Sequence, residues 1–293
     1  MATEPTRIDL PSAHDQTVAV FRWLPAGDPR AVVQLTHGMG EHVLRYGHLV
    51  EVLTGSGFVV QGQDHRGHGA TARANGTEAG SLGPGGWDEL VADVGRLVER
   101  GRQDAPGVPL ILFGHSMGSF AVQQYLLDHS EDVDAAALTG TTLLDQIEGA
   151  IDTSGPVDLS GFNAPFAPAR TDYDWLSRDE AQVDAYVADE WCGFGLDSQA
   201  ATEMLAGGRA VADPQRLAAM RQDLPVYIAV GEHDPVGGPV VLAEALAERY
   251  RAAGLKDVTF RVWSDGRHEI LNETNRDAVE GELLTWIEGA VGR

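Results

Sequence analysis

The sequence predicts an α/β domain in which helices flank a mostly parallel central sheet, and two observations lead to this prediction. Short apolar runs rich in β-branched residues recur along the chain, and helical patterns fall between most of them. Such alternation is typical of parallel sheets, because each helix returns the chain to the edge at which the next strand begins. The strand-like runs cover residues 17–23, 31–36, 57–62, 109–114, 134–139, 225–231 and 257–263.

The alternation breaks between about Thr141 and Asp213, a stretch too long for a simple connection. A chain of 293 residues fits one α/β domain with an insertion better than two independent domains. We therefore expect a core formed by residues 1–140 and 214–293, and a helical cap or lid formed by residues 141–213. The aromatic and apolar residues of this insertion include Phe162, Phe166, Tyr173, Trp175, Leu176, Tyr186, Trp191 and Phe194.

The most informative local motif is Gly-His-Ser-Met-Gly at residues 114–118, directly after the apolar run 110–113 and before a helical stretch at 120–127. This strand–turn–helix order is typical of a nucleophile elbow. The turn forces the serine into a strained conformation, and side chains two positions to either side would collide with their surroundings. Glycines at both positions avoid that collision. Ser116 is therefore the candidate nucleophile.

A carboxylate and a histidine follow in the order that such a nucleophile requires. Asp234 comes shortly after the apolar run 224–230, and His268 lies in the loop after the strand-like run 258–263. Because the carboxyl ends of parallel strands share one edge of the sheet, we expect all three side chains at that edge. We predict that His268 is the general base and that Asp234 orients it.

Each of these two assignments has an alternative. Asp234 and the proline after it could form an ordinary turn, and His268 could cap the helix that starts near Asn272. His233 and Asp265 compete for the two roles. His233 would place the base on the loop of the acid, however, and Asp265 lies too close to His268 in the chain for the usual arrangement on separate loops.

The oxyanion hole is expected from two backbone N–H groups. The first belongs to Met117, the residue after the nucleophile. The second belongs to the loop after the strand-like run 31–35, where Thr-His-Gly-Met-Gly occupies residues 36–40. Its glycines let the backbone approach the reacting centre, which makes Met39 the second candidate donor. A tight structural turn is compatible with the same sequence.

With these residues in place, the chain resembles the monoacylglycerol lipase and lysophospholipase group of α/β-hydrolases, more broadly the serine aminopeptidase-like hydrolases. The matching segments follow one another in the same order over nearly the whole chain. They are HGMGEH at residues 37–42 with Arg45 and Tyr46, DHRGHG at 64–69, the elbow at 114–118, Gly231 with DPV at 234–236, and RHE at 267–269.

The resemblance implies the α/β-hydrolase fold with a helical cap, and a serine esterase that needs no metal and no cofactor. It also implies single-chain acyl glycerols or related esters as substrates. Two positions depart from the family pattern: Ser119 stands where the family often has another glycine, and Thr71 replaces a usual serine. Neither position belongs to the triad, and both leave the substrate range open.

Residues 172–194 resemble the cap of that family, and four of them are candidates for substrate binding. These candidates are Trp175, Trp191, Cys192 and Phe194. The family often has Asp-Pro before the cysteine where this chain has Asp189-Glu190-Trp191, and Trp191 either reshapes an acyl channel or packs the cap on the body. Cys192 either lines the pocket or is buried and inert. The proline-containing stretch 162–169 is either a flap that touches lipid aggregates or a rigid surface loop.

Four histidines near the glycine-rich loops raise the question of a metal site: His37, His42, His65 and His68. No pair of cysteines or carboxylates accompanies them at ligand spacing, so we expect no metal there. Asp64, Arg66 and His68 are expected instead to brace their loop through charge-assisted hydrogen bonds. Glu41 and Arg45 belong to the family motif, but their spacing of four residues equally suits an ordinary helix pair.

The chain contains 21 basic and 44 acidic residues, for a formal net charge of −23. Such acidity argues against nucleic-acid partners and against electrostatic docking on anionic membranes. No apolar run approaches the roughly 20 residues that an integral membrane segment needs, and residues 1–15 do not resemble a signal peptide. The single cysteine rules out an internal disulfide, which fits a reducing compartment. We therefore expect a cytoplasmic protein.

The sequence thus predicts a serine ester hydrolase that acts on monoacylglycerol- or lysophospholipid-like esters. The expected partner is a small-molecule ester or monoacyl lipid, with transient contact between the cap and lipid aggregates. One alternative is a small-ester carboxylesterase. Another is an aminopeptidase-like amidase in which Asp172, Asp174 and Glu190 would bind the substrate amine. A catalytically silent binder should have lost one of the three catalytic candidates, and the chain has all three.

Overall fold

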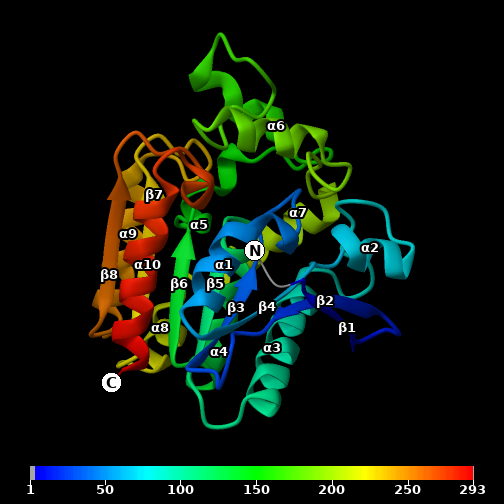
Figure 1. The fold of residues 1–293 in the computed structure, drawn as a ribbon. Helices are drawn as coiled ribbons and strands as arrows, with labels where there is room; N and C mark the ends of the chain where they lie inside the picture. The colour runs from blue at the N-terminus through cyan, green and yellow to red at the C-terminus, as the bar shows by residue number, and fades with distance from the viewer. Residues whose placement is uncertain (1–3, 293) are drawn as a thin grey trace.

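A computed structural model describes residues 4–292, and its central element is one eight-stranded sheet (Figure 1). In the order in which they lie side by side, its strands are β1 (Thr6–Pro11), β2 (Thr17–Trp23), β4 (Phe58–Gln63), β3 (Ala31–Thr36), β5 (Leu110–His115), β6 (Ala135–Thr139), β7 (Val226–Gly231) and β8 (Val258–Trp263). Among these strands only β2 runs antiparallel to its neighbours, so the sheet is parallel from β4 to β8. The predicted fold class is confirmed, and every predicted strand-like run forms a strand.

β1 is the one described strand that the sequence analysis missed. It lies at the edge of the sheet, pairs with β2 alone, and exposes most of its residues. Its two apolar side chains, Ile8 and Leu10, pack on Val18, Val20 and Leu97. A short edge strand with two inward-facing apolar residues leaves only a weak alternating pattern in the sequence.

Alternate side chains of the central strands enter two separate hydrophobic cores. Leu110 and Leu112 of β5 belong to one core, whereas Ile111 and Phe113 belong to the other. Helices cover both faces: α3 (Gly86–Asp104), α4 (Met117–His129) and α9 (Val240–Ala252) cover the first, and α1 (Gly47–Gly55) and α10 (Arg276–Val291) cover the second. Because both faces are covered, every residue of β5 is buried, which explains its continuous apolar run.

The chain between β6 and β7 leaves the sheet at its carboxyl edge, and Figure 1 shows α6 beyond the ends of the strands. The helices of this segment are α5 (Leu144–Ile147), α6 (Glu180–Ala188), α7 (Ser198–Ala210) and α8 (Pro214–Ala219), with 3₁₀ turns at Glu148–Ala150 and Leu159–Phe166. α7 packs against α3 and α4 and so joins the core on that face of the sheet. A separate small cluster includes Leu159, Trp175, Leu176 and Tyr186. The division of the chain into core and cap at residues 141 and 213 stays a prediction.

Short elements occupy the loops at the carboxyl edge of the sheet. They are α2 (Gly69–Asn75) and the 3₁₀ turns Val43–Tyr46 and Ile270–Asn272, and a further 3₁₀ turn, Ser130–Asp132, precedes β6. Within residues 4–292, no helix combines the length and the hydrophobicity that crossing a bilayer would require.

Candidate active site

Ser116 lies at the sharp turn between β5 and α4, with φ 50° and ψ −124°. An L-residue rarely adopts a positive φ, so the surrounding fold holds this serine in a strained conformation. A Cβ on Gly118 would lie 2.1 Å from the carbonyl oxygen of Thr36, and a Cβ on Gly114 would lie 2.8 Å from the backbone of Ser119. No side chain fits at either distance. The two glycines of the motif therefore permit the turn that presents Ser116.

His268 and Asp234 form a buried hydrogen-bonded pair on the loops after β8 and β7. The Nδ1 atom of His268 lies 2.9 Å from each carboxylate oxygen of Asp234, and the two residues are 2% and 7% exposed. Burial opposes the charge on both groups, but their attraction and hydrogen bond outweigh it. The pKa of Asp234 is consequently lowered, and the pKa of His268 is raised.

The competing candidates do not lie at this site. His233 and Asp265 expose 56% and 71% of their side chains, and neither lines the pocket that contains Ser116. His268 does not cap the next α-helix, because α10 begins at Arg276 and has Asn275 at its N-cap. The turn after Asp234 does exist, since its Oδ1 accepts the N–H of residue 236 at 2.9 Å, but this bond coexists with the contact to the histidine.

Ser116 and His268 line one pocket between the sheet edge and the segment after β6. Most of its wall is apolar. The apolar side chains are Met39, Met117, Phe120, Ile147, Ile151, Val157, Leu159, Phe162, Trp175, Leu176, Met204 and Val236. Three polar lining residues, Glu41, Tyr186 and Glu269, are neighbours because each contacts the guanidinium group of Arg45. The pocket therefore has a long apolar wall and one polar corner.

The loop after β3 passes directly against the serine. A Cβ on Gly38 would lie 3.1 Å from the Cβ of Ser116, so the backbone comes this close only with glycine there. Gly38 donates its N–H to Glu41 Oε1 at 2.6 Å, and Gly40 donates its N–H to His68 Nε2 at 3.2 Å. Buried side chains thus fix the loop on both sides of residue 39.

Both predicted oxyanion donors line the same pocket as the serine. The N–H of Met39 lies between the two anchored N–H groups of its neighbours. Met117 is the first residue of α4, and an N–H at that position has no acceptor within its own helix. The helix dipole adds partial positive charge at the same point.

Residues 27–275 match the model of the family described as "Serine aminopeptidase, S33". The chain belongs to this family of α/β-hydrolases. Its similar relatives include the monoacylglycerol lipase of Mycolicibacterium smegmatis, which is 32% identical over 90% of each chain. The monoglyceride lipase of Mus musculus is 28% identical, covering 95% of this chain and 90% of the relative. A crystal structure of a thermostable carboxyl esterase from Bacillus coagulans matches with a TM-score of 0.86, 26% identity and 99% coverage of both chains. The resemblance found in the sequence is confirmed.

The family motif after β3 forms a charged network with the loop of His268. Arg45 donates to both oxygens of Glu269, at 2.5 Å and 2.8 Å, and to Glu41 Oε2 at 2.7 Å. Tyr46 donates to Glu41 Oε1 at 2.8 Å. Burial alone would raise the pKa of Glu269, but the guanidinium group of Arg45 lowers it to about 2. Glu41 and Arg45 were predicted as a possible helix pair, whereas Glu269 stood only in the RHE motif and had no predicted role.

The loops after β3 and β4 contain three fully buried histidines of the family motifs, and all three are neutral rings. His37 donates from Nδ1 to the carbonyl of Gly38 at 2.7 Å and accepts the N–H of His65 at 2.9 Å. His68 donates from Nδ1 to the carbonyl of Arg66 at 2.8 Å. Desolvation lowers the pKa of His65 to about 3 and of His68 to about 4, and it also lowers the pKa of His37. Their ring nitrogens serve as backbone partners that set the loop geometry.

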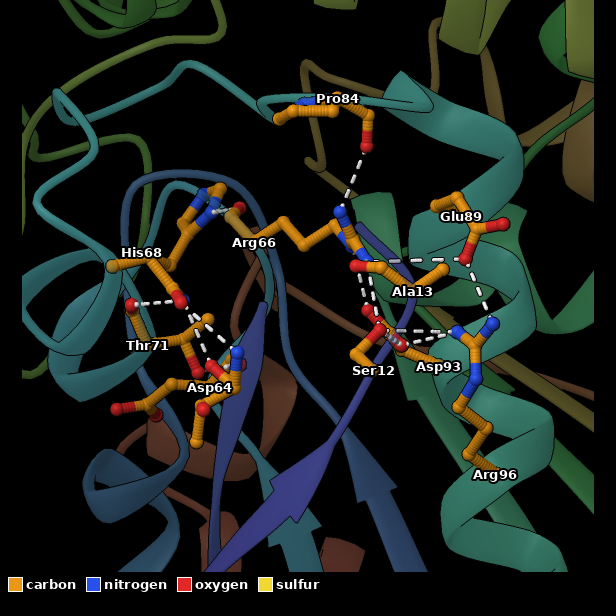
Figure 2. Close-up of polar contacts among 12 residues, drawn as sticks. Ser12, Ala13, Asp64, Arg66, His68, Thr71, Pro84, Glu89, Asp93 and Arg96 are labelled. Atoms are coloured by element: carbon orange, nitrogen blue, oxygen red, sulfur yellow. Dashed lines mark hydrogen bonds and ion pairs between the residues drawn. The ribbon is translucent and has the colours of Figure 1, made fainter. Parts of the chain in front are cut away.

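Figure 2 shows how the DHRGHG loop is braced further from the pocket. The carboxylate of Asp64 accepts two backbone N–H groups, at 3.0 Å and 2.8 Å. Thr71, one of the departures from the family pattern, donates its hydroxyl to the carbonyl of Asp64 at 2.6 Å. Arg66 pairs with the buried Asp93 at 2.7 Å. This threonine therefore supports the loop and does not line the pocket.

Of the four candidates for substrate binding, Trp175 lines the pocket, and its ring centroid lies 5.2 Å from that of His268. Trp191, Cys192 and Phe194 lie outside the residues that line it. Trp191 packs edge-on against His42, with ring centroids 5.5 Å apart, which suits a residue that joins the segment after β6 to the body. A substrate-binding role for these residues stays a prediction.

The three acids considered as an amine site do not line the pocket either. Glu190 pairs with Arg73 at the surface, at 2.7 Å. Asp174 accepts the hydroxyl of Thr171 at 2.6 Å, and Asp172 is exposed. The arrangement offers no carboxylate cluster from Asp172, Asp174 and Glu190 that would face a substrate amine.

Proposed function

We propose that this protein is a serine esterase that hydrolyses monoacylglycerol-like esters. The observation that supports this most strongly is the strained Ser116 in one pocket with His268, whose ring is held by the buried Asp234. The similarity to monoacylglycerol and monoglyceride lipases supports the substrate class.

In the proposed reaction, Ser116 attacks the ester carbonyl while Nε2 of His268 takes the hydroxyl proton. Asp234 holds Nδ1–H and stabilises the imidazolium that forms. The imidazolium then protonates the leaving alcohol, which departs and leaves an acyl-enzyme. Water, activated by the same imidazole, attacks the acyl carbonyl, releases the fatty acid and restores the serine.

The developing oxyanion would rest on the N–H groups of Met39 and Met117. Each such donor is worth on the order of 100–1000-fold in rate when it is held in place before the reaction. Glu41 and His68 supply that rigidity for the first donor, because they anchor the backbone on both sides of Met39.

The apolar wall of the pocket supports a single acyl chain as one half of the substrate. The polar corner supports a neutral alcohol as the other half. Glu41 and Glu269 bring two negative charges there and Arg45 only one positive charge, and no lysine or arginine is among the residues that line the pocket. A phosphate group would meet excess negative charge, whereas glycerol hydroxyls can donate to carboxylate oxygens. We therefore rank monoacylglycerols above lysophospholipids.

The test compares monoacylglycerols, lysophosphatidylcholines and p-nitrophenyl esters with matched acyl chains over a series of chain lengths. We expect the highest kcat/KM on medium or long monoacylglycerols, at least about tenfold above the matched lysophospholipid, a gap of about 1.4 kcal/mol. Ser116→Ala should lower kcat by about 10³–10⁶-fold. Ser154→Ala, at an exposed position, is the matched control and should leave the rate unchanged.

Other outcomes would assign a different function. A maximum at acetate or butyrate would indicate a small-ester carboxylesterase. Faster cleavage of lysophospholipids would contradict the argument from the charge of the polar corner. Absence of all hydrolysis, together with failure of a phosphonate probe to label Ser116, would reject the esterase and favour a binding protein.

A further inference from the structure

Three potential metal ligands meet where the segment after β6 touches the loop after β3. His42 follows Glu41 in that loop, and Asp189 and Cys192 lie just after α6. His42 Nε2 is 2.9 Å from Asp189 Oδ2, and one ligand atom from each of the three residues lies within 4.8 Å of the others. The pocket and the proposed reaction use none of these three side chains.

The donor set suits a zinc ion. Imidazole, thiolate and carboxylate are its usual protein ligands, and tetrahedral bonds of about 2.0–2.3 Å place ligand atoms roughly 3.3–3.8 Å apart. The three ligand atoms lie within 4.8 Å of one another, at most about 1 Å above that range. Asp189 exposes 34% of its side chain and Cys192 is partly exposed, so solvent can deliver the ion and provide a fourth ligand.

The ring of His42 is only half satisfied in the absence of a ligand. The residue is 6% exposed, and its Nδ1 atom is buried without a hydrogen-bond partner. Nε2, which faces Asp189, is the nitrogen placed to bind an ion. Because the bond to Asp189 is the one hydrogen bond described for the ring, turning the imidazole toward an ion breaks no other hydrogen bond.

The backbone around the cluster is already fixed. Cys192 donates its N–H to the carbonyl of Asp189 at 3.1 Å, which holds both residues on one tight turn. Gly193 then donates its N–H to the carbonyl of Gly40 at 3.0 Å. Only side-chain torsions therefore need to change for the ligand atoms to converge.

The local charge also suits a divalent cation. Cys192 is a free cysteine, and its thiol must lose a proton before sulfur can bind a metal ion. A zinc ion displaces that proton to solvent, and its charge is then balanced by the thiolate and by Asp189. The nearby guanidinium group of Arg45 opposes a cation, but Glu41 and Glu269 together more than neutralise it.

We propose that His42, Asp189 and Cys192 bind one Zn²⁺, with water as the fourth ligand, and that the ion fastens the segment after α6 to the loop after β3. Tyr186 of α6 lines the pocket, so bound zinc should restrain this part of the pocket wall, slow substrate entry and product release, and lower ester turnover. This effect on turnover rests on the proposed function, whereas the binding site itself does not.

The binding test is a titration of the untagged, full-length protein with Co²⁺, which replaces Zn²⁺ and absorbs light. We expect saturation at one equivalent, a near-ultraviolet thiolate-to-Co²⁺ charge-transfer band, and the intense visible bands of tetrahedral Co²⁺. Cys192→Ser should abolish the charge-transfer band, and His42→Gln and Asp189→Asn should weaken binding by more than about tenfold. Circular dichroism checks that each variant is folded.

His48→Gln is the matched control, because His48 belongs to a separate cluster with Asp277 and Glu280 that offers no sulfur ligand. It should keep the charge-transfer band. Absence of this band in the wild type at one equivalent would overturn the site, as would a band that survives in Cys192→Ser.

The activity test measures ester hydrolysis with and without stoichiometric Zn²⁺, each variant against its own zinc-free rate. We expect at least a tenfold loss of rate that a chelator reverses, and no loss in Cys192→Ser. Equal inhibition of wild type and Cys192→Ser would overturn the effect on turnover. A protein without any esterase activity would reject the proposed function alone, because the Co²⁺ spectrum tests the site independently.

Discussion

The guanidinium group of Arg45 lies against both carboxylate oxygens of Glu269, at 2.5 Å and 2.8 Å, although the two residues stand 224 positions apart. Arg45 belongs to the loop after β3, which also contains the candidate oxyanion donor Met39. Glu269 directly follows His268. The contact therefore joins the two loops that must keep their relative position for the proposed reaction.

Replacing Glu269 with glutamine should destabilise the fold and slow hydrolysis together. Breaking a buried ion pair costs about 3–5 kcal/mol, and we expect the lower part of this range because Glu41 remains as a partner for Arg45. Urea denaturation measures the free energy of unfolding, and kcat/KM reports the loop position. The matched control is Glu288→Gln, whose exposed pair with Arg30 is worth under about 1 kcal/mol. If Glu269→Gln and Glu288→Gln lowered the free energy of unfolding equally, the role of the buried pair would be contradicted.

The elbow shows why part of the site could be predicted from sequence. Gly114, Ser116 and Gly118 are close in the chain, and one turn imposes all three, so a local pattern is enough to find them. Asp234 and His268 were found because each follows a strand, and parallel strands end at one edge. These inferences need local spacing and strand order, and no knowledge of side-chain packing.

The Arg45–Glu269 pair could not be predicted in the same way. Local spacing offered Glu41 as the partner of Arg45, and that pair exists, but the bidentate contact depends on how two distant loops pack. The same holds for Trp191, whose place against His42 follows from how α6 sits on the loop after β3. Such contacts are set by tertiary packing, which no periodicity in the sequence records.

Adding one methyl group at Gly118 should destroy the elbow. The Cβ of alanine would lie 2.1 Å from the carbonyl oxygen of Thr36 and 2.5 Å from that of His37, and both are backbone atoms that cannot move independently. We expect Gly118→Ala to lower kcat/KM by more than about 100-fold, or to prevent folding. Thermal unfolding and hydrolysis rates check this. Gly281→Ala in α10 meets open space and should instead stabilise the helix by about 1 kcal/mol.

The raised pKa of His268 predicts the pH dependence of hydrolysis. The proposed base acts only when neutral, so kcat/KM should rise with pH through a midpoint above the ordinary histidine value of 6.5. Asp234→Asn removes the negative charge that raises this pKa, so the midpoint should move to lower pH while kcat falls by about 10⁴-fold. Rate profiles from pH 5 to 9 measure both effects. Asp265→Asn, at an exposed position, should leave the profile unchanged; an unshifted midpoint in Asp234→Asn would contradict the pairing.

Mild acid should destabilise the fold through His37, His65 and His68. Their pKa values are lowered in the folded protein, to about 3 for His65 and about 4 for His68, whereas the unfolded chain titrates near 6.5. Below pH 6.5 the unfolded state therefore binds protons that the folded state cannot, and stability falls by up to about 1.4 kcal/mol per pH unit for each histidine. Between pH 6.5 and 5 most carboxylates still keep their charge, so buried histidines dominate this window; His115, whose pKa desolvation lowers to about 4, adds to their effect. Urea denaturation at several pH values gives the slope of the unfolding free energy against pH. His65→Gln should reduce this slope by the contribution of one histidine, because glutamine has no proton to gain. His129→Gln, at an exposed position, should leave the slope unchanged, and an identical slope in His65→Gln would show that the lost stability comes from other groups.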